Sequence, residues 1–278
     1  MILGKINTLT ANRTTDNGFY LIDEKENEVL LPNKYVVPSL KIGDTLNVFV
    51  YKDSEDRIVA TTADPTIKRH EFAYLKVKDV NKFGAFLDWG LDKDLLVPFF
   101  EQAQKMEKEK SYIVYLYLDQ ETDRLVASSK IDDFIEDEDI DLAENQEVDL
   151  LVTKKTDLGY KVIIDHLFEG LIYHNEIFQP IQIGDWIKGY VKPLREDGKI
   201  DIILQKAGYK NVNEPNSILI LDKIKANNGF LGVNDKSSPN EIYDEIGLSK
   251  KAFKKAIGSL YKQKLILIEK NGLYLTKS

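Results

Sequence analysis

The stretch that decides the fold is Lys82-Phe83-Gly84-Ala85-Phe86-Leu87, followed by Leu95-Leu96-Val97-Pro98. A related pattern occurs once upstream and, in weaker form, once downstream: Asn17-Gly18-Phe19 with Val29-Leu30-Leu31-Pro32, and Gly159-Tyr160 with Gly170-Leu171-Ile172. The first two copies have a nearly constant offset, 66 residues from Leu30 to Leu96 and 67 from Arg57 to Arg124. A constant offset of this size indicates a repeated domain rather than one shared loop.

Each repeat has the alternation of apolar and polar residues that is typical of half-buried β-strands, as in residues 74–78 and 112–118. Five strands in about 65 residues are too few for a β-sandwich, but they fit a closed five-stranded barrel of the oligonucleotide-binding (OB) fold. We therefore expect three consecutive OB-fold barrels, at residues 1–64, 65–134 and 145–208.

The pattern changes from strands to helices after Pro215, and residues 216–227 are amphipathic. A capping box with proline at the first helical position, Ser238-Pro239-Asn240-Glu241, predicts the start of a second helix. Gly247 then predicts its end.

The remaining residues predict a third helix and a hairpin. Ser249 can cap a helix whose apolar stripe consists of Phe253, Ala256, Ile257, Leu260 and Tyr261. Asn271-Gly272 predicts a tight turn between two closing strands. Three helices and a hairpin predict an α+β winged helix-turn-helix at residues 214–278. Together with the three barrels, this domain makes the expected protein multidomain and mainly β.

The composition argues against an enzyme. The 278 residues include no cysteine and three histidines, none with a second histidine at the spacing of a helical metal site. Neither a Gly-x-x-x-x-Gly-Lys nor a Gly-x-Gly-x-x-Gly phosphate loop is present. We therefore expect no catalytic residue, no metal site and no cofactor.

Hydropathy predicts a protein that does not enter membranes. No apolar run approaches the roughly 18 residues that a membrane-spanning helix needs. Met1 leads into strand-like residues rather than into a signal peptide. We therefore expect a cytoplasmic protein.

The second repeat resembles the RNA-binding domain of the first protein of the small ribosomal subunit. In that family two phenylalanines flank the glycine on the strand that faces the ligand, and they correspond here to Phe83 and Phe86. A histidine usual in the family is replaced by Pro98, and the first repeat keeps Phe19 of the aromatic pair, with Asn17 in the other position. Three such domains before a winged helix resemble the bacterial conserved virulence factor B family, which implies RNA binding and an effect on gene expression.

The second repeat combines aromatic rings with cations, which is the chemistry that grips single-stranded RNA. If Leu75 and Val77 point into the barrel, their neighbours point outward beside the aromatic pair. The expected RNA-binding residues are Phe83, Phe86, Tyr74, Lys76, Lys78, Lys82, Arg124 and, in the first repeat, Phe19. The structural alternative is that Phe83 and Phe86 cap the barrel core. In the third repeat we expect Trp186 to lie in the core.

Charge singles out the winged helix as the second candidate surface. The net charge of −8 divides into −3, −2 and −7 for residues 1–64, 65–134 and 135–213, against +4 for residues 214–278. The lysines that fall away from the apolar stripe or lie in the hairpin are Lys250, Lys251, Lys254, Lys255, Lys262 and Lys270. Lysines contact phosphates but seldom specify bases, and a plain solvated face is the structural alternative.

The leading hypothesis is a monomeric protein that binds single-stranded RNA and regulates gene expression after transcription. One alternative is a DNA-binding transcriptional regulator led by the winged helix, although residues 214–278 contain no arginine. A second is a scaffold that contacts the ribosome or RNA polymerase. A third, a nuclease, needs a constellation of carboxylates that the scattered acidic residues do not suggest.

Overall fold

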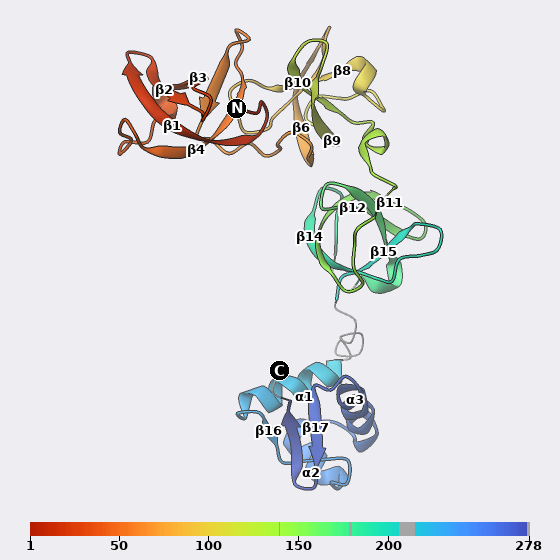
Figure 1. The fold of residues 1–278 in the computed structure, drawn as a ribbon. Helices are drawn as coiled ribbons and strands as arrows, with labels where there is room; N and C mark the ends of the chain where they lie inside the picture. The colour runs from red at the N-terminus through yellow and green to blue at the C-terminus, as the bar shows by residue number, and fades with distance from the viewer. Residues whose placement is uncertain (139, 178–179, 206–214, 277–278) are drawn as a thin grey trace. The chain divides into compact units, whose positions relative to one another are not determined.

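A computed structural model describes residues 1–138, 140–177, 180–205 and 215–276, which form two compact units (Figure 1). One unit comprises residues 1–143 and 147–202, and the other comprises residues 144–146 and 203–278. The expected boundary between the third barrel and the winged helix, at residues 208–214, lies outside the described residues. No helix in the described part of the chain is long and apolar enough to cross a membrane.

The first and third repeats each form a closed five-stranded barrel. The strands of the first are β1 (Ile6–Thr15), β2 (Gly18–Ile22), β3 (Glu28–Pro32), β4 (Thr45–Lys52) and β5 (Ile58–Thr61), in the order β1-β2-β3-β5-β4. Those of the third are β11 (Glu147–Lys155), β12 (Gly159–Ile164), β13 (Phe168–Tyr173), β14 (Trp186–Val191) and β15 (Ile200–Ile203), in the corresponding order. The OB-type barrel is therefore confirmed for these two repeats.

The second repeat has the same strand order but forms a sheet that its hydrogen bonds do not close. Its strands are β6 (Phe72–Asn81), β7 (Gly84–Leu87), β8 (Leu95–Pro98), β9 (Ser111–Asp119) and β10 (Arg124–Ser128), in the order β10-β9-β6-β7-β8. β8 lies beside β10, yet the described residues form no ladder between them. The expectation of a third closed barrel is thus corrected, and the second barrel is an open one. The equivalent parallel pairing in the first barrel, between β3 and β5, is also short, because Leu30 and Val59 are its one registered pair.

Short 3-10 helices accompany the three repeats. They are η1 (Asn33–Tyr35), η2 (Phe99–Glu101), η3 (Ile131–Phe134) and η4 (His174–Glu176). Three of them, η1, η2 and η4, directly follow the third strand of their repeat, so the repeats match beyond their strands.

A glycine at an equivalent position begins the second strand of each repeat, and the reason is steric. A Cβ added to Gly84 would clash with the carbonyl oxygen of Val97 on β8, and the equivalent clash occurs at Gly18 and Gly159. The φ angle of Gly84 is +152°, which residues with a side chain rarely adopt. These three glycines therefore align the repeats residue by residue.

One hydrophobic cluster spans the first two repeats, beside a separate core inside the first barrel. Phe49 and Tyr51 of the first barrel and Trp89 of the second are all buried in the same cluster, together with Ile67 from the connecting segment. The indole ring of Trp89 meets Phe49 and Tyr51 edge-on, with ring centroids 5.8 and 6.3 Å apart. Such contacts hold the two barrels together in the way that a single domain is held.

A second apolar cluster joins the second and third barrels. Phe72 is buried in it against Leu151 and Ile163, and the Phe72 backbone N–H donates a 2.9 Å hydrogen bond to Nδ1 of His166. Trp186, expected in the core, is instead 45% exposed and packs its ring on His166. The correction has a simple cause, because Trp186 begins β14 on its outward-facing register.

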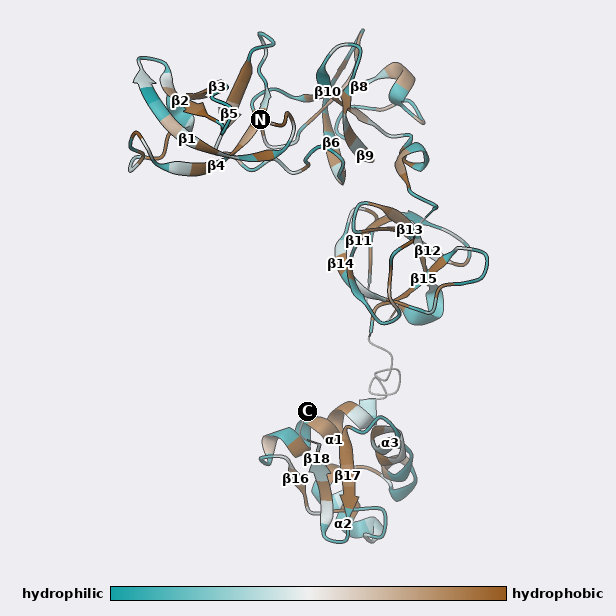
Figure 2. Cartoon of the chain, viewed as in Figure 1, coloured by the Kyte–Doolittle hydropathy of each residue, from teal (hydrophilic) through white to brown (hydrophobic). Residues whose placement is uncertain are grey.

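The second unit is the expected winged helix. It contains α1 (Pro215–Ala226), β16 (Phe230–Leu231), α2 (Pro239–Ile246), α3 (Lys250–Lys262), β17 (Ile266–Glu269) and β18 (Gly272–Leu275), with the sheet order β16-β18-β17. Both predicted caps are present, because Ser238 forms the capping box with Glu241 and Ser249 accepts from the Ala252 N–H. Tyr261, expected in the apolar stripe, is 53% exposed. Figure 2 shows hydrophobic residues along β17 and hydrophilic residues in the connecting turns.

We expect Gly84→Ala to destabilise the barrels by about 1–3 kcal/mol, because the added methyl group must displace β8 or strain the turn. Gly258→Ala is the control. A Cβ at Gly258 in α3 meets no atom outside its own helix, so this change should stabilise the winged helix by about 0.5–1 kcal/mol. Urea unfolding measures both, followed by tryptophan fluorescence, to which Trp89 and Trp186 of the barrels contribute, and by circular dichroism for the helices. An unchanged fluorescence midpoint for Gly84→Ala would contradict the steric argument.

Candidate nucleic-acid interface

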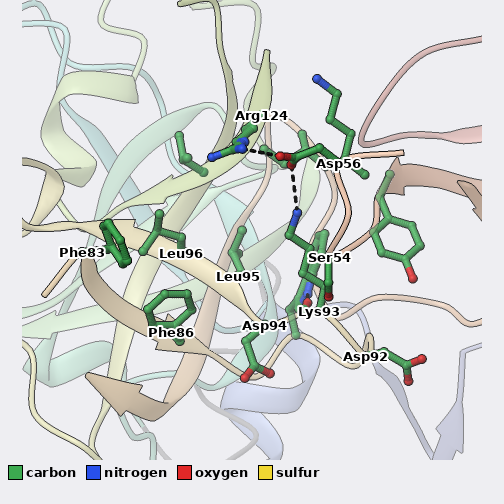
Figure 3. A pocket seen from close by; sticks show the side chains of 15 residues that line it. Ser54, Asp56, Phe83, Phe86, Asp92, Lys93, Asp94, Leu95, Leu96 and Arg124 are labelled. Atoms are coloured by element: carbon green, nitrogen blue, oxygen red, sulfur yellow. Dashed lines mark hydrogen bonds and ion pairs between the residues drawn. The ribbon is translucent and has the colours of Figure 1, made fainter. Parts of the chain in front are cut away.

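A cleft of about 520 Å³ lies where the first two barrels meet, and we call it the inter-barrel cleft (Figure 3). The second barrel contributes residues of β7, β8 and β10 and of the segment between β7 and β8, and the first contributes the end of β4 and the turn that follows. Its lining residues are Tyr51, Lys52, Ser54, Asp56, Phe83, Phe86, Trp89, Asp92, Lys93, Asp94, Leu95, Leu96, Arg124, Leu125 and Val126. Three of the expected RNA-binding residues, Phe83, Phe86 and Arg124, are thus brought together.

Phe83 and Phe86 face the cleft rather than the barrel core. The core is filled by the alternate residues of β7, since Ala85 and Leu87 are fully buried. Phe83, in the turn before β7, is 61% exposed, and Phe86 is half-buried on the wall of the cleft beside Leu95 and Leu96. Exposed aromatic rings on an apolar wall suit the stacking of flat ligands such as nucleobases.

The other expected residues of the second repeat are spread more widely. Leu75 and Val77 are buried and their neighbours exposed, as the alternation predicts. Lys82 places its Nζ 5.0 Å from the centroid of the Phe83 ring, and Lys78 pairs at 2.8 Å with Asp94, which lines the cleft.

Five of the expected residues do not line the cleft: Phe19, Tyr74, Lys76, Lys78 and Lys82. Lys76 pairs instead with Glu109. The ring of Tyr74 lies against Gly184 of the third barrel, so closely that a Cβ at Gly184 would clash with it. Tyr74 and Lys76 are thus separated from the aromatic pair.

Arg124 is neutralised from the first barrel. Its guanidinium donates to Oδ2 of Asp56, while Oδ1 of the same carboxylate lies 3.6 Å from Nζ of Lys93 (Figure 3). The hydrogen bond from Arg124 is the main reason that the pKa of Asp56 is lowered. Sequence reasoning missed Asp56 and Lys93, because no periodic pattern links residues of different barrels.

An acid at the start of the third strand recurs in all three repeats. Counted from the aligned glycines, Glu28, Asp94 and Glu169 are equivalent, and each pairs with a cation on the first or second strand of its repeat. This recurrence was visible in the sequence once the repeats were aligned on glycine. One cation on each barrel is therefore already neutralised by an acid of the same repeat.

In the first barrel the position of Phe86 is taken by Tyr20 rather than by Phe19. Tyr20 pairs with Leu30 as Phe86 pairs with Leu96, whereas Phe19 packs against the barrel core. The guanidinium of Arg13 covers the Tyr20 ring at 3.8 Å and is itself paired with Glu28, whose pKa it lowers. One face of this ring is therefore already occupied.

The third barrel offers no aromatic ring at the two equivalent positions. Leu158 and Lys161 stand there, and Lys161 pairs with Glu169 at 2.7 Å. The neighbouring cavity of about 690 Å³ is also lined by Asp132, Glu136, Asp137 and Asp157. Acidic walls repel phosphate, so this face is poorly suited to a nucleic acid.

Several lysines of the winged helix lack the acidic partners that the cations of the barrels have. Among the described residues, Lys251, Lys254, Lys262 and Lys270 are exposed and form no ion pair. Lys250 is half-buried and lies near Glu241, and Lys255 is exposed. Unpaired cations on one helix attract phosphates without having to give up a partner first. The described residues hold no cluster of three His, Cys, Asp or Glu side chains that could bind a metal ion.

Two domain families match the chain. Residues 3–63 and 71–130 match the S1 domain, and residues 219–275 match the CvfB-like winged helix domain. The matches cover the first two barrels and the second unit, so the chain is built from domains of nucleic-acid-binding types.

Relatives match along nearly the whole chain. "Uncharacterized protein YitL" of Bacillus subtilis is 30% identical over 281 residues, which cover 97% of this chain and 92% of that protein. "Conserved virulence factor B" of Staphylococcus aureus is 25% identical over 249 residues, covering 86% and 81%. A crystal structure of a multidomain protein with nucleic acid binding domains from Streptococcus pneumoniae is 24% identical, covers 99% of this chain and 98% of that one, and has a TM-score of 0.44. The two domain matches and the identity to full-length relatives show that this chain belongs to the conserved virulence factor B family.

Proposed function

We propose that this protein binds single-stranded RNA and thereby regulates gene expression after transcription. The observation that carries the proposal is the aromatic pair on the wall of the inter-barrel cleft, exposed Phe83 and half-buried Phe86. Each base that stacks on such a ring contributes about 1–3 kcal/mol to binding. We further propose that the protein acts as a cytoplasmic, non-enzymatic monomer.

The stacking surface is concentrated in the second barrel. Tyr20 of the first barrel already stacks with Arg13, and the third barrel presents Leu158 and Lys161 instead of rings. Stacking on one barrel engages only a few bases. Affinity for a longer RNA therefore needs a second contact in the same chain.

The winged helix supplies that second contact through charge. Its segment carries +4 in a chain of −8. Among the described residues, Lys251, Lys254, Lys262 and Lys270 form no ion pair, whereas Lys76, Lys78 and Arg124 of the second barrel are all paired. An RNA held at the winged helix is presented to the barrels at a high effective concentration, so the two weak contacts reinforce each other.

DNA binding is the second candidate, because a lysine face contacts the phosphates of duplex DNA as readily as those of RNA. Its sequence-specific form is disfavoured because residues 214–278 contain no arginine to read guanine. Filter binding across salt concentrations distinguishes the two. Single-stranded RNA should bind more tightly than random duplex DNA, and equal or tighter binding of the duplex would reject the RNA proposal.

We expect Phe83→Ala to weaken binding of single-stranded RNA by about 1–3 kcal/mol and to leave its salt dependence unchanged, because a stacked base is lost and no charge is removed. Phe100→Ala is the matched control, since Phe100 is 70% exposed and does not line the cleft. Both rings are exposed, so neither change should unfold the barrel. Equal affinities of the two variants in a fluorescence-anisotropy titration would show that Phe83 does not stack on RNA.

We expect the triple change Lys251→Ala, Lys254→Ala and Lys262→Ala to flatten the dependence of log K on log salt by about 0.7 for each lost phosphate contact. The control removes three lysines that are paired with acids, Lys110, Lys188 and Lys199. Both triple variants have the same net charge, so any difference in slope reports contacts rather than the overall field. Identical slopes would show that these lysines do not contact RNA phosphates, which would favour a protein partner for the winged helix.

A further inference from the structure

We propose that Arg124 and Lys93 form a phosphate subsite in the inter-barrel cleft, and that Asp56 of the first barrel occupies this subsite until an RNA phosphate replaces its carboxylate. This inference rests on the proposed binding of single-stranded RNA and adds a residue of the first barrel that controls it. The two cations approach different oxygens of one carboxylate, as they would approach two oxygens of a phosphate.

Comparison of the repeats shows why Arg124 needs an anion from elsewhere. Its counterpart in the first barrel, Arg57, pairs with Asp53 and Glu55 of its own turn, and its counterpart in the third, Lys199, lies 3.5 Å from Asp197 of its own turn. Arg124 alone of the three pairs with a different barrel.

The cause lies in the turn that precedes Arg124. The first barrel has Asp53-Ser54-Glu55-Asp56-Arg57, whereas the second has one residue more, Asp119-Gln120-Glu121-Thr122-Asp123-Arg124. With this insertion, Asp119 bonds the hydroxyl of Thr122 at 2.5 Å, where Asp53 bonds Arg57. The guanidinium of Arg124 is left to face the cleft.

Asp56 is presented by a turn that is built in advance. The carboxylate of Asp53 accepts from the backbone N–H groups of Glu55 and Arg57, and Nζ of Lys93 donates to the Asp53 carbonyl at 2.7 Å. Asp56 itself has a φ of +59°, a conformation that aspartate and asparagine tolerate. The turn therefore holds the carboxylate at the cleft without help from a ligand.

The Asp56–Arg124 pair is positioned to open. The side chains of Arg124 and Asp56 are 54% and 43% exposed, and exposed ion pairs contribute little to stability. A phosphate offers Arg124 a bidentate contact, which is stronger than the single bond it has with Asp56. The subsite shares the cleft with Phe83 and Phe86 (Figure 3), so a strand whose bases stack on the rings runs its backbone past the two cations.

The test is Asp56→Asn, which removes the negative charge and keeps the shape and the tolerated backbone conformation. We expect this variant to bind a single-stranded RNA oligonucleotide about three- to fivefold more tightly than the unchanged protein. The dependence of log K on log salt should stay the same, because the same phosphate contact forms in both complexes. Adding Arg124→Gln to Asp56→Asn should abolish the gain in affinity.

Glu55→Gln is the matched control. Glu55 is the preceding residue of the same turn and pairs with Arg57 of its own barrel, so its removal changes the net charge equally without freeing the subsite. Equal gains from Asp56→Asn and Glu55→Gln would overturn the subsite, because they would reflect general repulsion alone. Inorganic phosphate at matched ionic strength should not displace the RNA, and displacement would overturn the RNA backbone as the ligand.

The outcomes separate the subsite from the proposed function. If Asp56→Asn binds RNA like the unchanged protein while Phe83→Ala binds it more weakly, the subsite is wrong and RNA binding stands. If neither the unchanged protein nor Asp56→Asn binds single-stranded RNA, both proposals fall.

Discussion

Burial of Trp89 against Phe49 and Tyr51 is the contact on which the arrangement of the first two barrels depends. The indole belongs to the second barrel and the two rings to the first, yet all three lie in one continuous core. Separating the barrels would expose these rings to water at a cost of several kcal/mol. The turn that carries Asp56 is fixed beside Arg124 for this reason, and the inter-barrel cleft exists because the core beneath it is shared.

Charge pairing within the barrels limits how a nucleic acid can be held. The acids Glu28, Asp94 and Glu169 recur at one position and neutralise neighbouring cations, so the barrels attract phosphate weakly at long range. Short-range stacking on Phe83 and Phe86 is unaffected by this balance. Under the proposed RNA binding, the winged helix would provide attraction and the second barrel would provide contact with bases.

Features that depend on neighbouring residues could be predicted from the sequence. The aligned glycines, the alternation around Leu75 and Val77 and the cap at Ser238 were recognisable, because each is determined within one strand or turn. The open edge between β8 and β10 was not, because no local pattern shows whether the first and last strands of a sheet pair. Tyr20 was missed because the repeats were compared by their aromatic residues rather than by their glycines.

Contacts between barrels could not be predicted from the sequence for a related reason. Asp56 and Arg124 are 68 residues apart and belong to different repeats, so neither the period of a strand nor the offset of the repeats predicts their pairing. The same holds for Trp186, whose packing on His166 depends on a register that its own residues do not determine.

The shared core also determines how far this protein can be dissected. Although the repeats share one pattern, the first two are not interchangeable modules, because Phe49 and Tyr51 of one pack against Trp89 of the other. A fragment that ends between them would carry Trp89, or Phe49 and Tyr51, as a bare apolar patch and would tend to aggregate. The smallest fragment that can keep the cleft intact is therefore the pair of barrels together.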